Sequence, residues 1–151
     1  MSPQIGVAIW VCSGGRVLLG RRGKSSTHAQ GVWGLPGGKL DFGESLPACA
    51  VRETREEAGI EVKNIEFLAL TNDLFKNENK HFVTIFMIAD HQAGDPQVLE
   101  KNKMEQWAWF LPDQLPKPLF SPITNLFNQG IDLSKEISKR KLSLAFVGQD
   151  A

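Results

Sequence analysis

Residues 38–60, GKLDFGESLPACAVRETREEAGI, decide the fold of this chain. Ser45 is a favourable helix N-cap, and Gly59 is favourable just past a helix end, so the pattern predicts a helix between them. At about 100° per residue, spacings of three and four bring side chains onto one face. Pro47, Val51, Thr54 and Ala58 therefore form one face, where a hydrophobic core can receive them.

A second face of this predicted helix carries Glu53, Glu56 and Glu57. Three carboxylates on one face repel each other at neutral pH. Hard cations such as Mg²⁺ and Mn²⁺ prefer oxygen ligands and would hold such a group together. The alternative is a solvated helix face whose acids are balanced by Arg52 and Arg55, with Arg52 one turn before Glu56.

The lead-in favours the first interpretation. Gly37 and Gly38 allow a tight turn and a close approach to a ligand. Gly38, five residues, Glu44, seven residues and then RETREEAGI (52–60) resembles the Nudix box. The match departs at Thr54, where the family usually has an aliphatic residue, and Thr54 is a core position. The sequence is therefore identified as a member of the Nudix superfamily.

Length and composition predict one ordinary globular domain. The chain has 151 residues, 17 basic and 17 acidic side chains and no low-complexity tract. With a formal net charge of zero, no overall field attracts nucleic acid polymers or membranes. Cys12 and Cys49 give no disulfide framework. The run 5–12 is too short for a signal peptide, and no run of about 20 apolar residues is present. We therefore expect a cytoplasmic protein, and the sequence leaves a homodimer open.

Strand-like segments alternate with two helical segments, which predicts an α/β fold. The expected strands are 5–12, 16–22, 61–75, 81–89 and 107–110, and the helices are 45–59 and one within 118–129. The resemblance implies the Nudix fold, an α/β/α sandwich around a mixed sheet. We expect the Nudix domain to span residues 1–133. The tail, residues 134–151, is either a peripheral helix or a disordered end.

The resemblance also implies the reaction centre. Glu56 and Glu57, with the carbonyl of Gly37, would bind Mg²⁺, and Mn²⁺ is a second candidate. Glu53 would bind a second ion or orient the attacking water. Arg52 would not bind the metal itself but would fix the geometry of the carboxylates that do. The sequence does not separate the two roles of Glu53.

Residues outside the box complete the expected site. Family members often add a carboxylate from the loop before the WxW strand, for which Glu100 is our first candidate and Glu105 the second. Arg22 and Lys39 match phosphate-contacting positions of the MutT-type enzymes.

The pocket for the base is less clear from the sequence. By resemblance, it would be lined by Thr84, Phe120, Ser121 and Ile123, although ordinary core packing would also explain these residues. Ser121 stands where related nucleotide-sanitising enzymes carry a Trp, so their substrate preference does not transfer directly.

The resemblance implies Mg²⁺-dependent hydrolysis of a nucleoside triphosphate, modified or not, to the monophosphate and pyrophosphate. A dihydroneopterin triphosphate is the alternative substrate. The absence of tyrosine argues against the dinucleoside-polyphosphate group. The absence of an SQPWPFPxS array argues against NADH hydrolases, and the sequence LFK (74–76) lacks the proline of ADP-ribose hydrolases. A catalytically silent sensor domain is the alternative of another class, but such domains typically lose one or more acids of the box.

Overall fold

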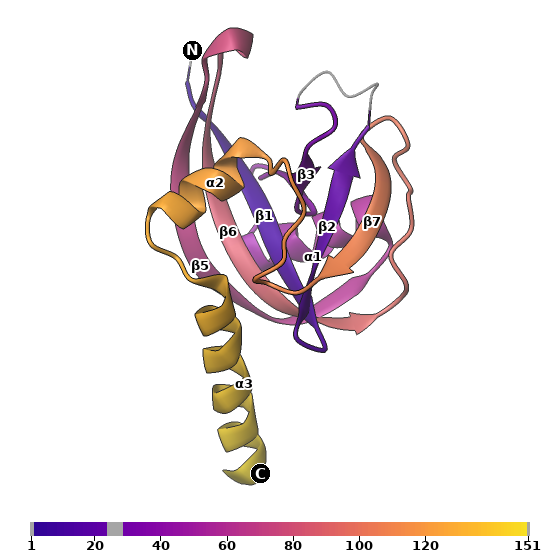
Figure 1. The fold of residues 1–151 in the computed structure, drawn as a ribbon, viewed down its shortest axis with the longest axis vertical. Coiled ribbons are helices and arrows are strands. Elements are labelled where there is room, and N and C mark those ends of the chain that lie inside the picture. Colours follow the sequence, from indigo (N-terminus) through magenta and orange to yellow (C-terminus); the bar gives the residue numbers. More distant parts are fainter. Residues whose placement is uncertain (1, 24–28, 151) are drawn as a thin grey trace.

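The computed structural model describes residues 2–23 and 29–150, with side chains up to residue 141. One mixed sheet forms its centre (Figure 1). Its strands are β1 Gln4–Ser13, β2 Arg16–Arg22, β3 Trp33–Gly34, β4 Gly37–Lys39, β5 Glu61–Phe75, β6 Lys80–Ala93 and β7 Met104–Phe110. The helices are α1 Leu46–Ala58, α2 Ser121–Asn128 and α3 Leu133–Asp150, with a short 3₁₀ turn, η1, at Lys76–Glu78.

The main path of the sheet runs β3-β2-β1-β6-β5, with β4 also paired to β1 and β7 to β2. Strands β1 and β6 are parallel, with Val7 opposite Ile85, whereas the other pairs are antiparallel. The predicted hairpin of the first two strands is present. Its turn contains Gly14 and Gly15 at φ 56° and 79°, as a two-residue hairpin turn of the favoured kind requires.

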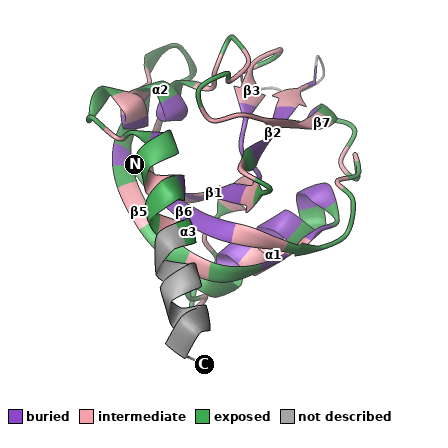
Figure 2. Cartoon of the chain, turned by 60° about the horizontal axis from the view of Figure 1, so that its bottom comes forward, coloured by how far each residue is buried: buried purple, intermediate pink, exposed green. Residues whose placement is uncertain are grey.

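Two hydrophobic cores cover the two faces of the sheet, and the alternation along β1 separates them. Val7, Ile9 and Val11 face the core under α1, whereas Trp10 faces the core under α2 and α3. A strand has a side-chain period of two, so its sequence serves both faces. Buried residues lie on both sides of the sheet in Figure 2. The predicted α/β/α sandwich around a mixed sheet is confirmed.

Helix α1 has the predicted boundaries. The Ser45 side chain accepts a hydrogen bond from the Ala48 backbone N–H at 3.1 Å, and Gly59 ends the helix at φ 67° and ψ 28°. Thr54, the departure from the family pattern, is fully buried. Its hydroxyl donates to the Ala50 carbonyl at 2.9 Å, so this polar group is satisfied inside the helix and the core accepts it.

The sequence predicted two helices, and the structure has a third. The segment after residue 133, left open as helix or disordered end, forms α3, which extends away from the sheet in Figure 1. Leu133 and Ile137 belong to the second core, so α3 crosses the expected domain boundary. Among the described residues, no helix combines the length and apolarity that a membrane crossing requires.

Arg140 fastens α3 to the sheet, and we predict that it stabilises the fold. Its side chain is 9% exposed and reaches Glu66 and Asp90, each at 3.1 Å. Arg140→Ala should lower the free energy of unfolding by about 1–3 kcal/mol, because Asp90 and the Asn64 carbonyl lose a charged hydrogen-bond donor. Urea unfolding measures this change. Lys139→Ala is the control: its side chain is 61% exposed, and its removal should cost no more than about 0.5 kcal/mol. Equal losses would contradict the role of Arg140.

Candidate active site

The glycine pair in β4 allows the strand to lie close to β1 at Gly37 and to α1 at Gly38. A Cβ at Gly37 would fall 2.2 Å from the Val7 carbonyl oxygen, and one at Gly38 would fall 2.5 Å from the Glu53 carboxyl carbon. Real Cβ atoms do not approach other atoms so closely, so any side chain here would displace the strand or the glutamate. The two glycines are therefore required by the close approach of backbone and carboxylate.

Arg52 organises the polar end of the site. Its guanidinium donates to Glu44 at 2.7 and 2.9 Å, to Glu53 at 2.8 Å, to Glu56 at 3.2 Å and to the Lys39 carbonyl at 3.1 Å. These bonds hold the pKa of Glu44 well below its usual range, at about 2. The expected pairing of Arg52 with Glu56 is present. The guanidinium also ties the loop before α1 to two of the three box acids.

Glu57 is a buried acid with a strongly perturbed pKa. It is 6% exposed and accepts a hydrogen bond from the Gly37 backbone N–H at 3.4 Å. Burial, together with the nearby charge of Glu53, raises its pKa to about 8. Burial also raises the pKa of Glu53, against the opposing effect of Arg52. Burial thus disfavours the charged forms of both acids when no metal cation is beside them, even though Glu53 is paired with Arg52.

The loop before β7 faces these acids. Glu100 lines the same cavity as Glu53 and Glu57, whereas Glu105 pairs with Arg21 at 2.8 Å. Of the two candidates for a further carboxylate, the geometry thus favours Glu100. Lys103 also lines the cavity and pairs with Glu100 at 3.0 Å. Sequence reasoning missed Lys103, and the one available signal was its place in the loop that supplies Glu100.

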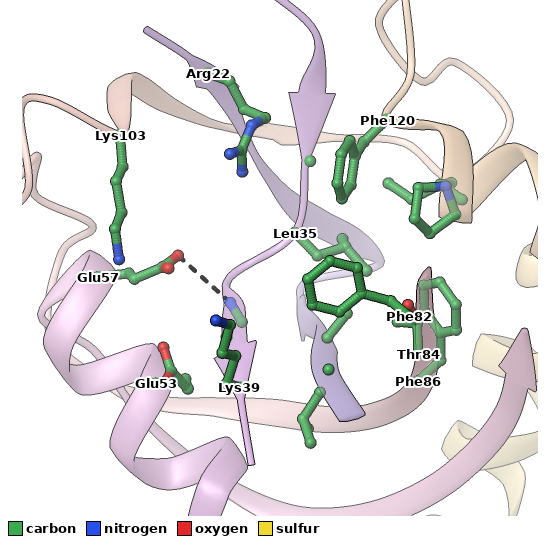
Figure 3. A pocket seen from close by; sticks show the side chains of 18 of the residues that line it. Arg22, Leu35, Lys39, Glu53, Glu57, Phe82, Thr84, Phe86, Lys103 and Phe120 are labelled. Atoms are coloured by element: carbon green, nitrogen blue, oxygen red, sulfur yellow. Dashed lines mark hydrogen bonds between the residues drawn. The ribbon is translucent and has the colours of Figure 1, made fainter. Parts of the chain in front are cut away.

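A cavity of about 520 Å³ connects these acids to an apolar end. Besides Arg52, three cations line it, and their side chains point inwards in Figure 3: Arg22, Lys39 and Lys103. Arg22 also lies over the Phe120 ring, with its guanidinium carbon 5.1 Å from the ring centroid. The positive groups therefore lie between and around the two ends, where a chain of phosphates would need them.

The apolar end is lined by aromatic and aliphatic side chains: Leu35, Phe75, Phe82, Phe86, Phe120, Pro122 and Ile123, with Thr84 among them (Figure 3). Phe75 and Phe120 are stacked, with ring centroids 5.8 Å apart at 22°. Three of the residues expected at the base lie here: Thr84, Phe120 and Ile123. Ser121 is exposed and does not line the cavity. It opens the first turn of α2, and the helical rotation brings Pro122 to the wall instead.

The donor set fits a hard divalent cation. Carboxylates of Glu53, Glu56, Glu57 and Glu100 share one cavity, and oxygen ligands are those that Mg²⁺ prefers. Across residues 2–23 and 29–150, no three acidic, His or Cys side chains are already gathered in a metal-binding arrangement. Glu53 and Glu56 are instead hydrogen-bonded to Arg52, and Glu57 accepts from the Gly37 backbone N–H.

Comparison with known proteins identifies the class. Residues 2–128 match the NUDIX domain family, so the chain belongs to the Nudix family. The NAD-capped RNA hydrolase NudC of Pseudomonas aeruginosa is 34% identical over 116 residues, which are 77% of this chain and 38% of that protein. The mitochondrial NAD(P)H pyrophosphatase NUDT13 of Mus musculus is 33% identical over 78% of this chain and 32% of its own length. The chain thus spans about two fifths or less of these relatives.

Among solved structures, a MutT Nudix hydrolase from Burkholderia pseudomallei is similar, with a TM-score of 0.76 and 31% identity. The similarity covers 83% of this chain and 97% of that one. The MutT protein of Methanosarcina mazei Go1 shares the fold, with a TM-score of 0.71 and 23% identity over 85% and 93% of the two chains. These similarities confirm the Nudix fold and the MutT-type architecture expected from the sequence.

We predict that Glu57→Gln stabilises the metal-free protein, increasingly as pH rises. With a folded-state pKa of about 8 against an ordinary value of 4.5, Glu57 retains its proton on folding, so the wild type loses stability between pH 4.5 and 8. The variant avoids this loss while its amide oxygen still accepts from Gly37. At pH 8 in excess chelator, its free energy of unfolding should be higher by about 1–3 kcal/mol.

Chemical unfolding at pH 5 and pH 8 measures this difference, which should shrink at pH 5. Excess Mg²⁺ should stabilise the wild type more than the variant. A variant that is less stable at both pH values in chelator would contradict the burial of a costly charge at Glu57.

Proposed function

We propose that this chain catalyses the Mg²⁺-dependent hydrolysis of a (deoxy)nucleoside triphosphate to the monophosphate and pyrophosphate. One observation carries the proposal: a single cavity has carboxylates at one end, aromatic side chains at the other, and the cations Arg22, Lys39 and Lys103 between and around them. A nucleotide has this order of groups, with a flat ring at one end and a metal-bound phosphate chain at the other. The class of reaction is that of the Nudix family.

Each charged group has a part in this reaction. Mg²⁺, when bound, neutralises phosphate oxygens and activates water. Glu56 and Glu57, with the Gly37 carbonyl and Glu100, would hold the ion. Arg52 positions Glu53 and Glu56, with hydrogen bonds of 2.8 and 3.2 Å. Glu53, whose carboxyl group packs against Gly38, would bind a second ion or orient the attacking water.

The cations bind and orient the phosphate chain. Arg22, Lys39 and Lys103 lie in the cavity wall, where each could meet a phosphate oxygen. Arg22 reaches the aromatic end of the cavity, since its guanidinium lies over the Phe120 ring. Such fixed charges compensate the negative charge of a triphosphate and hold its chain in line for attack.

The curated relatives suggest a second substrate class, dinucleotides of the NAD type. Two observations favour a triphosphate instead. The chain lacks the SQPWPFPxS array of NADH hydrolases. Among the described residues, the cavity has one aromatic end, which suits one ring. A pterin triphosphate would fit the same arrangement and is the alternative triphosphate.

A silent ligand-sensing domain is the alternative of another class. It would keep the fold but would need no functional set of acids. Here the acids are retained, and the glycine pair and Arg52 hold Glu53 in place. Two of the acids have pKa values raised by burial, which is typical of reaction centres. These features favour an enzyme.

We predict that activity requires a divalent cation and releases pyrophosphate as the first phosphorus-containing leaving group. A panel of nucleoside triphosphates, dihydroneopterin triphosphate and NAD⁺ would be incubated with Mg²⁺, and pyrophosphate and orthophosphate measured separately. At least one triphosphate should yield the monophosphate and pyrophosphate in equal amounts. Chelator should abolish turnover. The same panel distinguishes the triphosphates from each other and from a dinucleotide.

Glu57→Gln is the control for this assay, because it keeps the shape of the side chain and removes one charged ligand. Turnover should fall by about 10²- to 10⁴-fold if the ion supplies several kcal/mol of transition-state stabilisation. Full activity in chelator, orthophosphate as first product, or hydrolysis of NAD⁺ alone would overturn the proposal.

Lys39→Ala separates phosphate binding from metal binding. An ammonium group is no metal ligand, so the Mg²⁺ concentration at half-maximal activity should barely change. The loss of one charge-assisted hydrogen bond, about 1.5–3 kcal/mol, should lower kcat/KM by about ten- to a hundredfold. Steady-state kinetics at saturating Mg²⁺ measures it. Lys101→Ala is the control, since Lys101 is exposed outside the cavity. Equal kcat/KM in all three proteins would leave Lys39 without a role.

A further inference from the structure

Asp73 is a buried acid that the proposed reaction does not use. It lies on β5 and is 1% exposed. Three side chains donate hydrogen bonds to it: Thr71 at 2.8 Å, Thr84 at 2.6 Å and Asn125 at 2.8 Å. Both threonine hydroxyls share Oδ2, and the Asn125 amide binds Oδ1. The carboxylate is therefore satisfied by groups from two strands and a helix.

One of these donors reaches the apolar end of the cavity. Thr84 is 8% exposed and lines that end, between Phe82 and Phe86 along β6. Thr71 pairs with it across the strands and is 1% exposed, but it is not part of the cavity lining. Among the described residues that line the apolar end, Thr84 has the one uncharged polar side chain, and Arg22 lies over Phe120 (Figure 3).

We propose that Asp73 fixes the hydroxyl of Thr84 as a hydrogen-bond acceptor, so that the cavity selects a ring that presents an N–H donor at this position. This inference rests on the proposed function, since it assigns the ring end of the same cavity. A hydroxyl has one proton and two lone pairs, whereas an ionised carboxylate only accepts. Because the single proton of Thr84 is donated to Asp73, its oxygen can offer the ligand only a lone pair.

The space beside this oxygen is suited to a ligand. A Cβ built on Gly6 would lie 3.9 Å from Thr84 Oγ1 and 3.8 Å from the Phe82 ring. A Cβ would fit at Gly6 without a clash, so the absence of a side chain there leaves room next to the Thr84 hydroxyl. The side chains on either side of Thr84 along β6, Phe82 and Phe86, are apolar, so the hydroxyl is the polar group that a ligand atom meets at this wall. An unmatched polar group in such surroundings is costly, which makes the site selective.

Asp73 also positions the wall opposite the sheet. Its bond to Asn125 joins β5 to α2, the helix that carries Pro122 and Ile123 into the cavity. One carboxylate thus sets both the polarity of the ring site and the placement of its apolar wall. Asp73 is a positioning residue, because it acts on the ligand through Thr84.

Binding of nucleoside monophosphates tests this inference without needing turnover. We would measure the dissociation constants of AMP and IMP, and of CMP and UMP, by calorimetry. Within each pair, the donor and acceptor positions on the ring edge are exchanged. The wild type should prefer one member of at least one pair by about tenfold. Thr84→Val, which keeps the shape and removes the hydroxyl, should reduce that preference to less than about twofold.

Thr71→Val is the matched control. It removes the other hydroxyl from the same Asp73 oxygen but none from the cavity, so the preference should persist. Asp73→Asn should reverse the preference, because its amide nitrogen donates to Thr84 and frees the hydroxyl proton for the ligand. A purely structural role of Asp73 would weaken binding of both members equally. Circular dichroism checks that each variant folds, and if Asp73→Asn does not, the two threonine variants decide.

A wild type without preference, or without binding, overturns the inference, as does a preference that survives Thr84→Val. An unchanged direction in folded Asp73→Asn removes Asp73 from the proposal. Failure of the proposed function looks different: it would be absence of pyrophosphate release from every triphosphate, whatever the monophosphates bind.

Discussion

The ion pairs of Arg52 are the interaction on which the polar half of this protein depends. A guanidinium offers five N–H donors in a rigid plane, and here they reach two acids of α1, Glu44 and the Lys39 carbonyl. Without this cation, the acids on one face of α1 would repel each other. With it, one oxygen of Glu53 and one oxygen of Glu56 accept hydrogen bonds from the guanidinium. The bonds of Arg52 to Glu44 and to the Lys39 carbonyl fix the segment before α1 to the same helix.

The approach of β4 to α1 is the second constraint, and it explains why the site lies where it does. Gly37 and Gly38 let the strand contact Glu53 and Glu57 with its backbone. Strand β4 pairs with β1, which runs beside β6, so the same sheet leads from the acids to the ring end. The cavity therefore links two regions that are far apart in the sequence, residues 37–57 and residues 73–123.

Features that depend on neighbouring residues could be predicted from the sequence, whereas contacts between residues distant in the sequence could not. The caps of α1, the hairpin turn and the glycine pair each depend on a few neighbouring residues, and the structure has them as predicted. Asp73 and Asn125 are 52 positions apart, and Lys103 reaches the box acids only through the fold. Ser121 was expected at the ring although Pro122 lies there, because the boundary of α2 decides which residue faces inwards. The sequence did not decide whether residues 134–151 form a helix, because Arg140 of α3 binds partners on β5 and β6 that are distant in the sequence.

Similarity to known Nudix proteins bears on the acidic end of the cavity but not on the end that would bind the ring. The acids of α1, Gly38 and Arg52 belong to the box on which the family resemblance rests, so membership of the family bears on this end of the cavity. The ring end is built by β5, β6 and α2, outside the box, around an acid that no motif marks. Relatives named for NAD-type substrates and structures named for MutT thus match the same chain without conflict. Ring preference follows from whether a hydroxyl donates or accepts, a property that the neighbouring carboxylate sets.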